Sequence, residues 1–330
     1  MKRFIIALLS SCLLLSACVQ KYAPNLETPH EIDYHPIEEY SLNELNNDQF
    51  VLIPISIPYT DRSYYRIRIE SPFVDLGRFG LTGAELEPLR YLANLNALGL
   101  NHNQISDLSY LKDLVRLEFL GLDSNYIRDL SSLENFTRLD TLLLDHNLIN
   151  DLSALKNLTN LRHLTFHGNQ ISDISPLYNL DNLRYLSIGD NQIRDISALL
   201  NLTNLITLSI SNNQINDISV LENMTDLERL YLHDNEIIDI TSLRNLTDLR
   251  ELYLSHNEIS DITPLANLTS LTRLKLDHNQ ITDFTPLIGL TNLRTLQVEG
   301  RSEYAITDEQ LEMLRTALPN TTIRDPFGLL

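Results

Sequence analysis

The chain has 330 residues and a formal net charge of −19, with 44 acidic against 25 basic side chains. So large an excess of negative charge argues against binding to nucleic acid, and against adhesion to an acidic membrane surface through charge. Its only cysteines are Cys12 and Cys18, which excludes a small scaffold held together by disulfides.

The first residues predict export. Lys2 and Arg3 precede an apolar run over residues 4–15, and residues 15–18 read Leu-Ser-Ala-Cys. A charged start, a short apolar core and a small-residue site predict a secretory signal peptide over 1–17, too short to span a membrane. The Leu-Ser-Ala-Cys ending resembles a bacterial lipobox. That resemblance implies that Cys18 becomes the mature N-terminus and carries lipid; the alternative is an ordinary cleaved signal with an incidental cysteine.

If Cys18 is lipidated, the protein is anchored to the bacterial cell membrane or to an outer membrane, facing outside the cytoplasm. Residues 18–48 are acidic and lack apolar periodicity, which predicts a flexible tether. Residues 49–75 predict an N-terminal β-hairpin cap, because apolar residues alternate over 51–57 and again over 65–69, with a turn-like stretch between them.

Residues 76–298 repeat with a period of 22. One unit reads L-x-x-L-x-L-x-x-N-x-I-x-D-(I/L)-x-x-L-x-x-L-x-x, and the spacing of its asparagine never slips. The asparagines are Asn103, Asn125, Asn147, Asn169, Asn191, Asn213, Asn235, Asn257 and Asn279. This is a leucine-rich repeat, and its 22-residue form resembles the repeats of the internalin family of bacterial surface proteins. The resemblance covers about two-thirds of the chain.

The repeat predicts an α/β solenoid of about ten coils. In each unit the L-x-L pair predicts a short strand with one buried face, and these strands form a parallel sheet on the concave side. In this repeat class the asparagine points inward and bonds backbone groups of its own and the adjacent coil, so the nine form a ladder. The segment around Thr263 and Pro264 predicts a short 3₁₀ or α turn on the convex side, with Thr263 as its cap.

An aspartate follows four residues after each ladder asparagine, from Asp107 to Asp283. This file of carboxylates raises the possibility of calcium, which the sequence leaves open. We favour local hydrogen bonds from the following turn to each carboxylate. Residues 299–330 predict a C-terminal cap, with a helix begun by a capping box of Thr307 and Gln310 and a last strand over 321–324.

No catalytic arrangement is recognisable in the sequence. It contains no phosphate-binding glycine loop, no His-Glu-x-x-His and no nucleophile elbow, so an enzyme is disfavoured and no cofactor is predicted. No metal site is predicted either: His163 and His167 lie too far apart along a strand to share an ion. His102, His146, His256 and His278 each precede a ladder asparagine and are interpreted as exposed turn residues.

The predicted site is the concave face. Its outward positions are small or polar in early coils, as at Ala97, Gly99, Asn101 and Gly121, and become large later. Exposed tyrosine and arginine are enriched at binding hot spots. The predicted partner-binding residues are Tyr185, Arg229, Tyr231, His233, Glu251, Tyr253, Arg273 and Lys275. The alternative is a solvated sheet merely covered by large polar side chains.

These observations predict a lipid-anchored binding module. The internalin resemblance implies a protein partner, host or bacterial. The competing hypothesis is an envelope scaffold that binds another bacterial surface protein or a glycan.

Overall fold

The computed structural model describes residues 50–55, 63–68, 71–92, 94–298 and 305–324. The predicted signal peptide, Cys18 and the tether lie outside the described residues. The chain forms two compact units, residues 1–161 and 162–330. In both units the predicted α/β repeat solenoid is confirmed, with one three-residue strand and one short turn in almost every coil.

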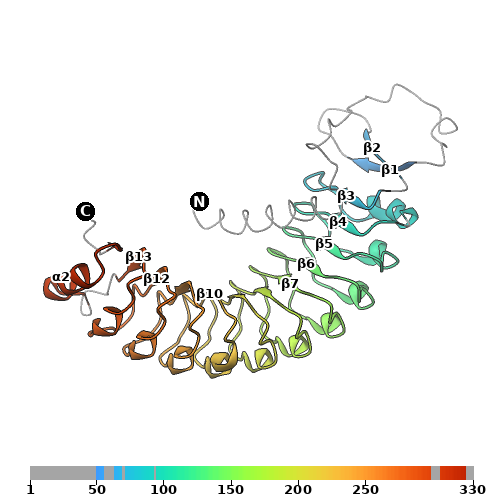
Figure 1. Ribbon diagram of the computed structural model, residues 1–330. Coiled ribbons are helices and arrows are strands. Elements are labelled where there is room, and N and C mark those ends of the chain that lie inside the picture. The colour runs from blue at the N-terminus through green and yellow to red at the C-terminus, as the bar shows by residue number, and fades with distance from the viewer. Residues whose placement is uncertain (1–49, 56–62, 69–70, 93, 299–304, 325–330) are drawn as a thin grey trace. The chain divides into compact units, whose positions relative to one another are not determined.

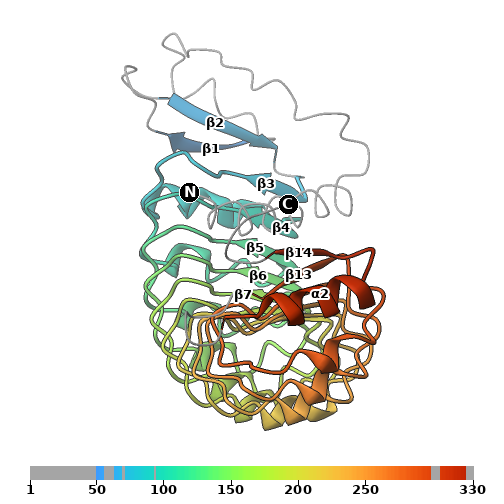
Figure 2. The same cartoon turned by 90° about the vertical axis from the view of Figure 1, so that its left-hand side faces the viewer.

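The first elements described in the first unit are β1 (Phe50–Ile55) and β2 (Ser63–Arg68), which form an antiparallel hairpin. Ile53 and Ile67 are buried, and β1 lies against η1 (Ala84–Tyr91). Figure 2 shows the hairpin beside the parallel strands of this unit. Those strands are β3 (Phe73–Asp75), β4 (Ala97–Gly99), β5 (Phe119–Gly121) and β6 (Thr141–Leu143). Its remaining turns are η2 (Ser109–Leu111), η3 (Ser131–Leu133) and η4 (Ser153–Leu155).

The second unit places its parallel strands on one side of each coil and its 3₁₀ turns on the other (Figure 1). The strands are β7 (His163–Thr165), β8 (Tyr185–Ser187), β9 (Thr207–Ser209), β10 (Arg229–Tyr231), β11 (Glu251–Tyr253), β12 (Arg273–Lys275), β13 (Thr295–Gln297) and β14 (Thr322–Arg324). The turns are η5 (Ser175–Leu177), η6 (Ser197–Leu199), η7 (Ser219–Asn223), η8 (Thr241–Leu243), η9 (Thr263–Leu265) and η10 (Thr285–Leu287).

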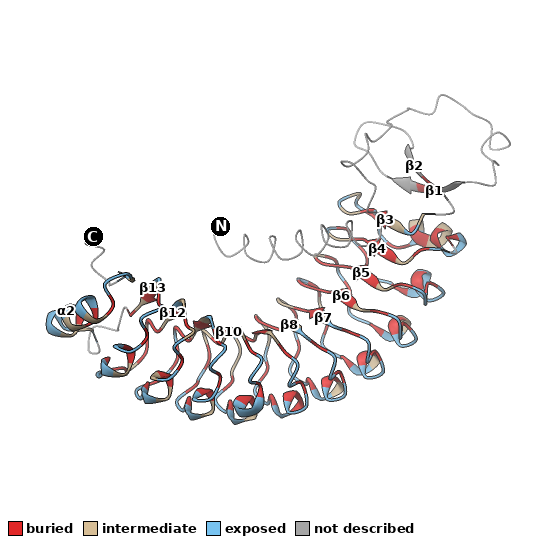
Figure 3. Cartoon of the chain, viewed as in Figure 1, coloured by how far each residue is buried: buried red, intermediate tan, exposed pale blue. Residues whose placement is uncertain are grey.

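The core fills the space between strands and turns, where buried residues line the inside of each coil (Figure 3). Leu252, Leu254, Ile259 and Leu265 are each fully buried, and the residues 22 positions away repeat the pattern. One coil cannot exclude water from these side chains by itself, so the stack requires neighbouring coils and a cap. At the C-terminal end, α2 (Asp308–Ala317) has both hydrogen bonds of a capping box between Thr307 and Gln310.

Two details of the fold differ from what the sequence predicts. Thr263 is the first residue of η9 rather than its cap, because the Asp261 carboxylate accepts the Thr263 N–H at 2.8 Å and satisfies that donor. The outward positions of the early coils are not all small or polar either. Phe119 and Leu143 form a buried apolar cluster with Ala97.

Within each unit, asparagine side chains tie a coil to the one before it. In Asn257 the amide oxygen accepts the N–H of Ile237 at 3.1 Å, while the amide nitrogen donates to the carbonyls of Leu232 and Leu254, both at 3.0 Å. Seven of the nine asparagines are buried, but Asn191 and Asn213 are only half-buried. Each buried amide thus satisfies backbone groups that no strand or turn reaches.

We expect Asn257→Ala to lower the free energy of unfolding by about 1–3 kcal/mol, because it leaves buried backbone groups without partners. The control is Asn245→Ala, whose side chain is exposed and whose loss should change stability by less than about 0.5 kcal/mol. Denaturant unfolding measures both. Equal midpoints and slopes for the two variants would contradict a stabilising role for the asparagine ladder.

A second polar column runs beside the first in the early coils. The side-chain oxygen of Asn101 accepts the N–H of Asp123 at 2.8 Å, and that of Asp123 accepts the N–H of Asp145 at 2.9 Å. Burial raises the pKa of Asp123 well above its ordinary value, and the neighbouring Asp145 carboxylate raises it further. An amide oxygen in this column accepts the backbone N–H of the next coil without adding a charge. A carboxylate oxygen accepts the same N–H but places a negative charge in the interior.

Because the folded pKa of Asp123 is raised, the stability linked to its proton is present below about pH 3.9 and is lost as pH rises through the folded pKa. We therefore expect Asp123→Asn to raise the free energy of unfolding at pH 7, with a gain that vanishes toward pH 4. Denaturant unfolding across this range tests it. Asp226→Asn, an exposed charge removal, is the control; an equal effect of both changes would contradict the argument.

Candidate partner-binding site

Strands β10, β11 and β12 present a compact group of side chains. The middle residue of each strand, Leu230, Leu252 or Leu274, is fully buried, so the flanking residues project from the opposite face. The register places them in two rows, Arg229–Glu251–Arg273 and Tyr231–Tyr253–Lys275. We call these six residues the tyrosine cluster.

Contacts within the tyrosine cluster run from strand to strand. The Tyr231 hydroxyl donates to Glu251 Oε2 at 3.1 Å, and Arg273 pairs with the other carboxylate oxygen of Glu251. The rings of Tyr231 and Tyr253 meet edge to face with centroids 4.9 Å apart, and Lys275 Nζ lies 4.2 Å from the Tyr253 centroid. Edge-to-face and cation–π geometry of this kind is favourable, so the side chains are already ordered before any partner arrives.

The two phenols are held in their neutral form. Burial, and next the negative charge of Glu251, raise the pKa of Tyr231 well above its ordinary value, and the same two causes raise the pKa of Tyr253. The cluster holds three cations and one carboxylate, so its formal charge is +2 on a chain of −19. It therefore offers aromatic surface, hydroxyl groups and positive charge together.

The structure does not bring all eight predicted residues together. Tyr185 lies on β8, separated from β10 by β9, and its ring stacks on His163 with centroids 6.4 Å apart. His233 lies just past the end of β10 and is half-buried. The other six form the cluster. Thr207 of β9, which pairs with both Tyr185 and Arg229, is small and buried, and it interrupts the row of large side chains.

The aspartate file has a structural use. Asp173, Asp217 and Asp261 each accept a backbone N–H from the residue two positions on, at 2.8 Å, and their counterparts in other coils do the same. The hydrogen bond from the Ser219 N–H lowers the pKa of Asp217, and the hydrogen bonds from the hydroxyl and the N–H of Thr263 lower the pKa of Asp261. The carboxylates thus hold the 3₁₀ turns in place.

Sequence reasoning missed one cluster that could hold a metal. His256, Asp277 and His278 come together at the turns that follow β11 and β12, although each histidine by itself looks like an exposed turn residue. The signal was present: histidine occupies one repeat position in two consecutive units. His167, which the sequence analysis considered together with His163, has its Nε2 atom 2.6 Å from Asp190 Oδ2.

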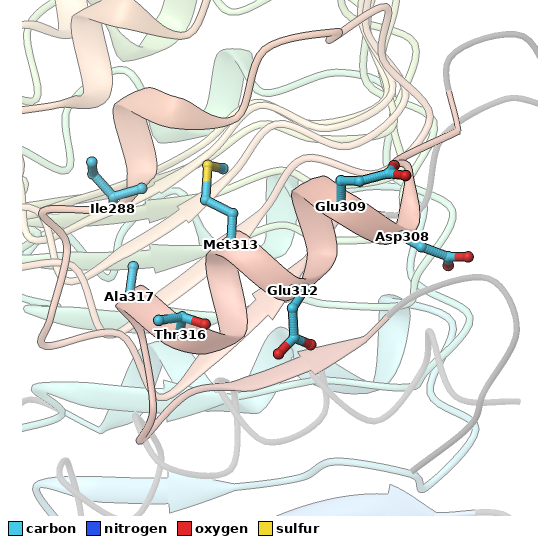
Figure 4. A pocket seen from close by; sticks show the side chains of 7 residues that line it. All are labelled: Ile288, Asp308, Glu309, Glu312, Met313, Thr316 and Ala317. Carbon is cyan, nitrogen blue, oxygen red and sulfur yellow. The ribbon is translucent and has the colours of Figure 1, made fainter.

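A hollow of about 780 Å³ lies beside α2. Figure 4 shows Met313 extending toward Ile288, and Glu312 on the other side of the helix. The remaining lining residues are Asp308, Glu309, Thr316 and Ala317. The lining offers apolar surface and carboxylates but no histidine, cysteine or lysine, and it includes no residue of the tyrosine cluster.

These features place the chain among the leucine-rich-repeat proteins, whose folds typically serve as binding scaffolds. The family model for leucine-rich repeats in two copies matches residues 137–179, 181–223 and 225–267. The chain is 31% identical to an internalin, InlF of Listeria monocytogenes, over 81% of this chain and 84% of that one, with a TM-score of 0.65. It therefore belongs to the internalin family.

Two further structures are similar. Internalin C2 of Listeria monocytogenes is 35% identical over 64% of this chain and 85% of its own, with a TM-score of 0.51. The ectodomain of the Arabidopsis thaliana receptor kinase GASSHO1/SCHENGEN3, solved in complex with CASPARIAN STRIP INTEGRITY FACTOR 2, is 22% identical over 76% of this chain and 35% of its own, with a TM-score of 0.61. This last likeness concerns the fold alone. A search of curated proteins finds no match.

Proposed function

We propose that this protein is a lipid-anchored surface protein that binds a protein partner through the tyrosine cluster. The observation that carries the proposal is the cluster itself, in which Glu251 holds Tyr231 and Arg273 and the Tyr253 ring holds Lys275. Tyrosine supplies a large contact area with little loss of side-chain entropy, and arginine supplies directional donors. Membership of the internalin family supports a binding role.

The charge of the cluster supports an acidic partner segment. The net negative charge of the chain disfavours approach of such a segment at acidic places, so docking at the +2 tyrosine cluster gains in specificity. A carboxylate of the partner could bind Arg229 or Lys275 while an apolar or aromatic side chain packs against Tyr253. Binding to a glycan is the competing outcome of the crosslinking experiment below, and the identity of a crosslinked protein tells a host partner from a bacterial one.

To find the partner, a photo-crosslinking amino acid is placed at Arg229 in intact cells, and the crosslinked species is identified. The same probe at Tyr178, an exposed residue that ends η5 on the turn side, is the control. We expect a protein crosslinked from position 229 and absent from position 178. A crosslinked glycan from position 229 supports the alternative, and identical products from both positions contradict the proposed face.

With the partner in hand, we expect Tyr231→Ala and Tyr253→Ala each to weaken binding by tenfold or more, about 1.4 kcal/mol. Calorimetric titration measures the affinity. Tyr178→Ala removes the same side chain from the turn side and should change the affinity by less than about twofold. Because Tyr231→Ala and Tyr253→Ala also remove the contact between the two rings, circular dichroism checks that each variant keeps its fold. An effect of Tyr178→Ala equal to the other two would contradict the assignment.

Attachment through Cys18 is the second part of the proposal. It is supported by the Leu-Ser-Ala-Cys ending of a short apolar segment. We expect Cys18→Ala to abolish incorporation of labelled fatty acid and processing at this position. Cys12→Ala, within the predicted signal peptide, should leave labelling intact. Undiminished labelling of Cys18→Ala would rule out the anchor.

A further inference from the structure

His256 and His278 occupy the same position of two successive coils. Both have positive φ, 56° and 59°, at the turn just before the ladder asparagine. One coil is displaced from the next by about the spacing of parallel strands, roughly 4.8 Å. The two imidazole rings therefore stack, with centroids 4.1 Å apart and planes only 12° from parallel.

Asp277 is the third member of the cluster with His256 and His278. Its side chain is only 7% exposed, and the Ser255 hydroxyl donates to its Oδ1. Its second oxygen, Oδ2, lies 3.3 Å from His278 Nδ1 and 4.0 Å from His256 Nε2. One ligand atom from each of the three residues falls within 4.8 Å of the other two. The carboxylate is buried, while the side chains of His256 and His278 are 47% and 36% exposed.

We propose that His256, Asp277 and His278 bind a zinc ion. Two imidazole nitrogens and one carboxylate oxygen form a donor set that zinc prefers, with a fourth position left for water. Tetrahedral zinc, with bonds of about 2.0–2.2 Å, places its ligand atoms roughly 3.3–3.5 Å apart. The 3.3 Å between His278 Nδ1 and Asp277 Oδ2 already fits this geometry. The largest separation, at most 4.8 Å, must shrink by about 1.3 Å, and the stacked rings must turn so that both nitrogen lone pairs point at one ion.

The same turn position elsewhere shows why this pair is special. From the first coil onward it holds His102, Ser124, His146, Gly168, Asp190, Asn212, Asp234, His256 and His278. His102 and His146 are two coils apart, roughly 9.6 Å by strand spacing, with Ser124 between them, so they cannot share an ion. They offer a matched control made of the same residue type in the same backbone conformation.

Zinc binding here is independent of the proposed partner. Its test needs only the mature chain and the metal. Zinc is titrated into the protein in competition with a chromophoric chelator, and the ring signals of His256 and His278 are followed by NMR. We expect the wild type to bind one ion that perturbs both rings. The double variant His256→Ala/His278→Ala should bind it at least about tenfold more weakly.

The double variant His102→Ala/His146→Ala should keep the wild-type zinc affinity. Asp277→Asn should also weaken binding by at least about tenfold, with circular dichroism showing an unchanged fold. The two histidine variants alter side chains that are exposed or half-buried, so they remain informative if Asp277→Asn impairs folding. Absence of zinc binding by the wild type, or equal loss in the two double variants, would overturn the proposal. Neither result would bear on the tyrosine cluster.

Discussion

Within each unit, the asparagine amide that joins a coil to the one before it is the interaction on which the rest of the structure depends. Its carbonyl oxygen and its N–H groups reach backbone partners that are separated from it by 20, 25 and 3 residues, as in Asn257. Those separations can recur only if every coil has the same length. The amide therefore holds the period at 22 residues, and an insertion within a coil would leave buried backbone groups unsatisfied.

Because the period is constant, residues at the same repeat position of successive coils lie side by side and their side chains come into contact. Tyr231, Tyr253 and Lys275 share one repeat position, and each contacts the next because it lies one strand away. The same displacement stacks His256 on His278. It also brings Asp123 close to Asp145, where the repeated residue type is unfavourable because both carboxylates are buried. One geometric rule thus produces a candidate binding surface, a candidate metal site and a destabilising charge pair.

Most of the fold could be predicted because it depends on local spacing. The alternation around Leu252 and Leu254 predicts a strand, and the fixed asparagine spacing predicts stacking. The prediction that Thr263 caps its turn was wrong, because the sequence does not reveal that the Asp261 carboxylate accepts the Thr263 N–H. The burial of Phe119 was missed because it depends on packing within a cluster rather than on periodicity.

The tyrosine cluster and the histidine pair show how far the sequence leads toward a site. Strand alternation places Tyr231 and Tyr253 on one face, but the role of Glu251 emerges only from the contacts, because its two oxygens serve residues on strands to either side. The histidines were judged one repeat at a time, although a pair exists only between repeats. Comparing the residues at one repeat position in successive coils would have identified the pair of His256 and His278.

Order within the tyrosine cluster affects what a partner gains on binding. Tyr231 and Arg273 are already held by Glu251, so docking costs less side-chain entropy than it would for free side chains. The same pairing limits them: a partner carboxylate must compete with Glu251 for Arg273, whereas Arg229 is exposed and Lys275 rests on an aromatic ring. We therefore expect the carboxylates of a partner to bind Arg229 and Lys275, which lie at the two ends of the cluster, more readily than Arg273. The ordered tyrosines between them supply the apolar contact.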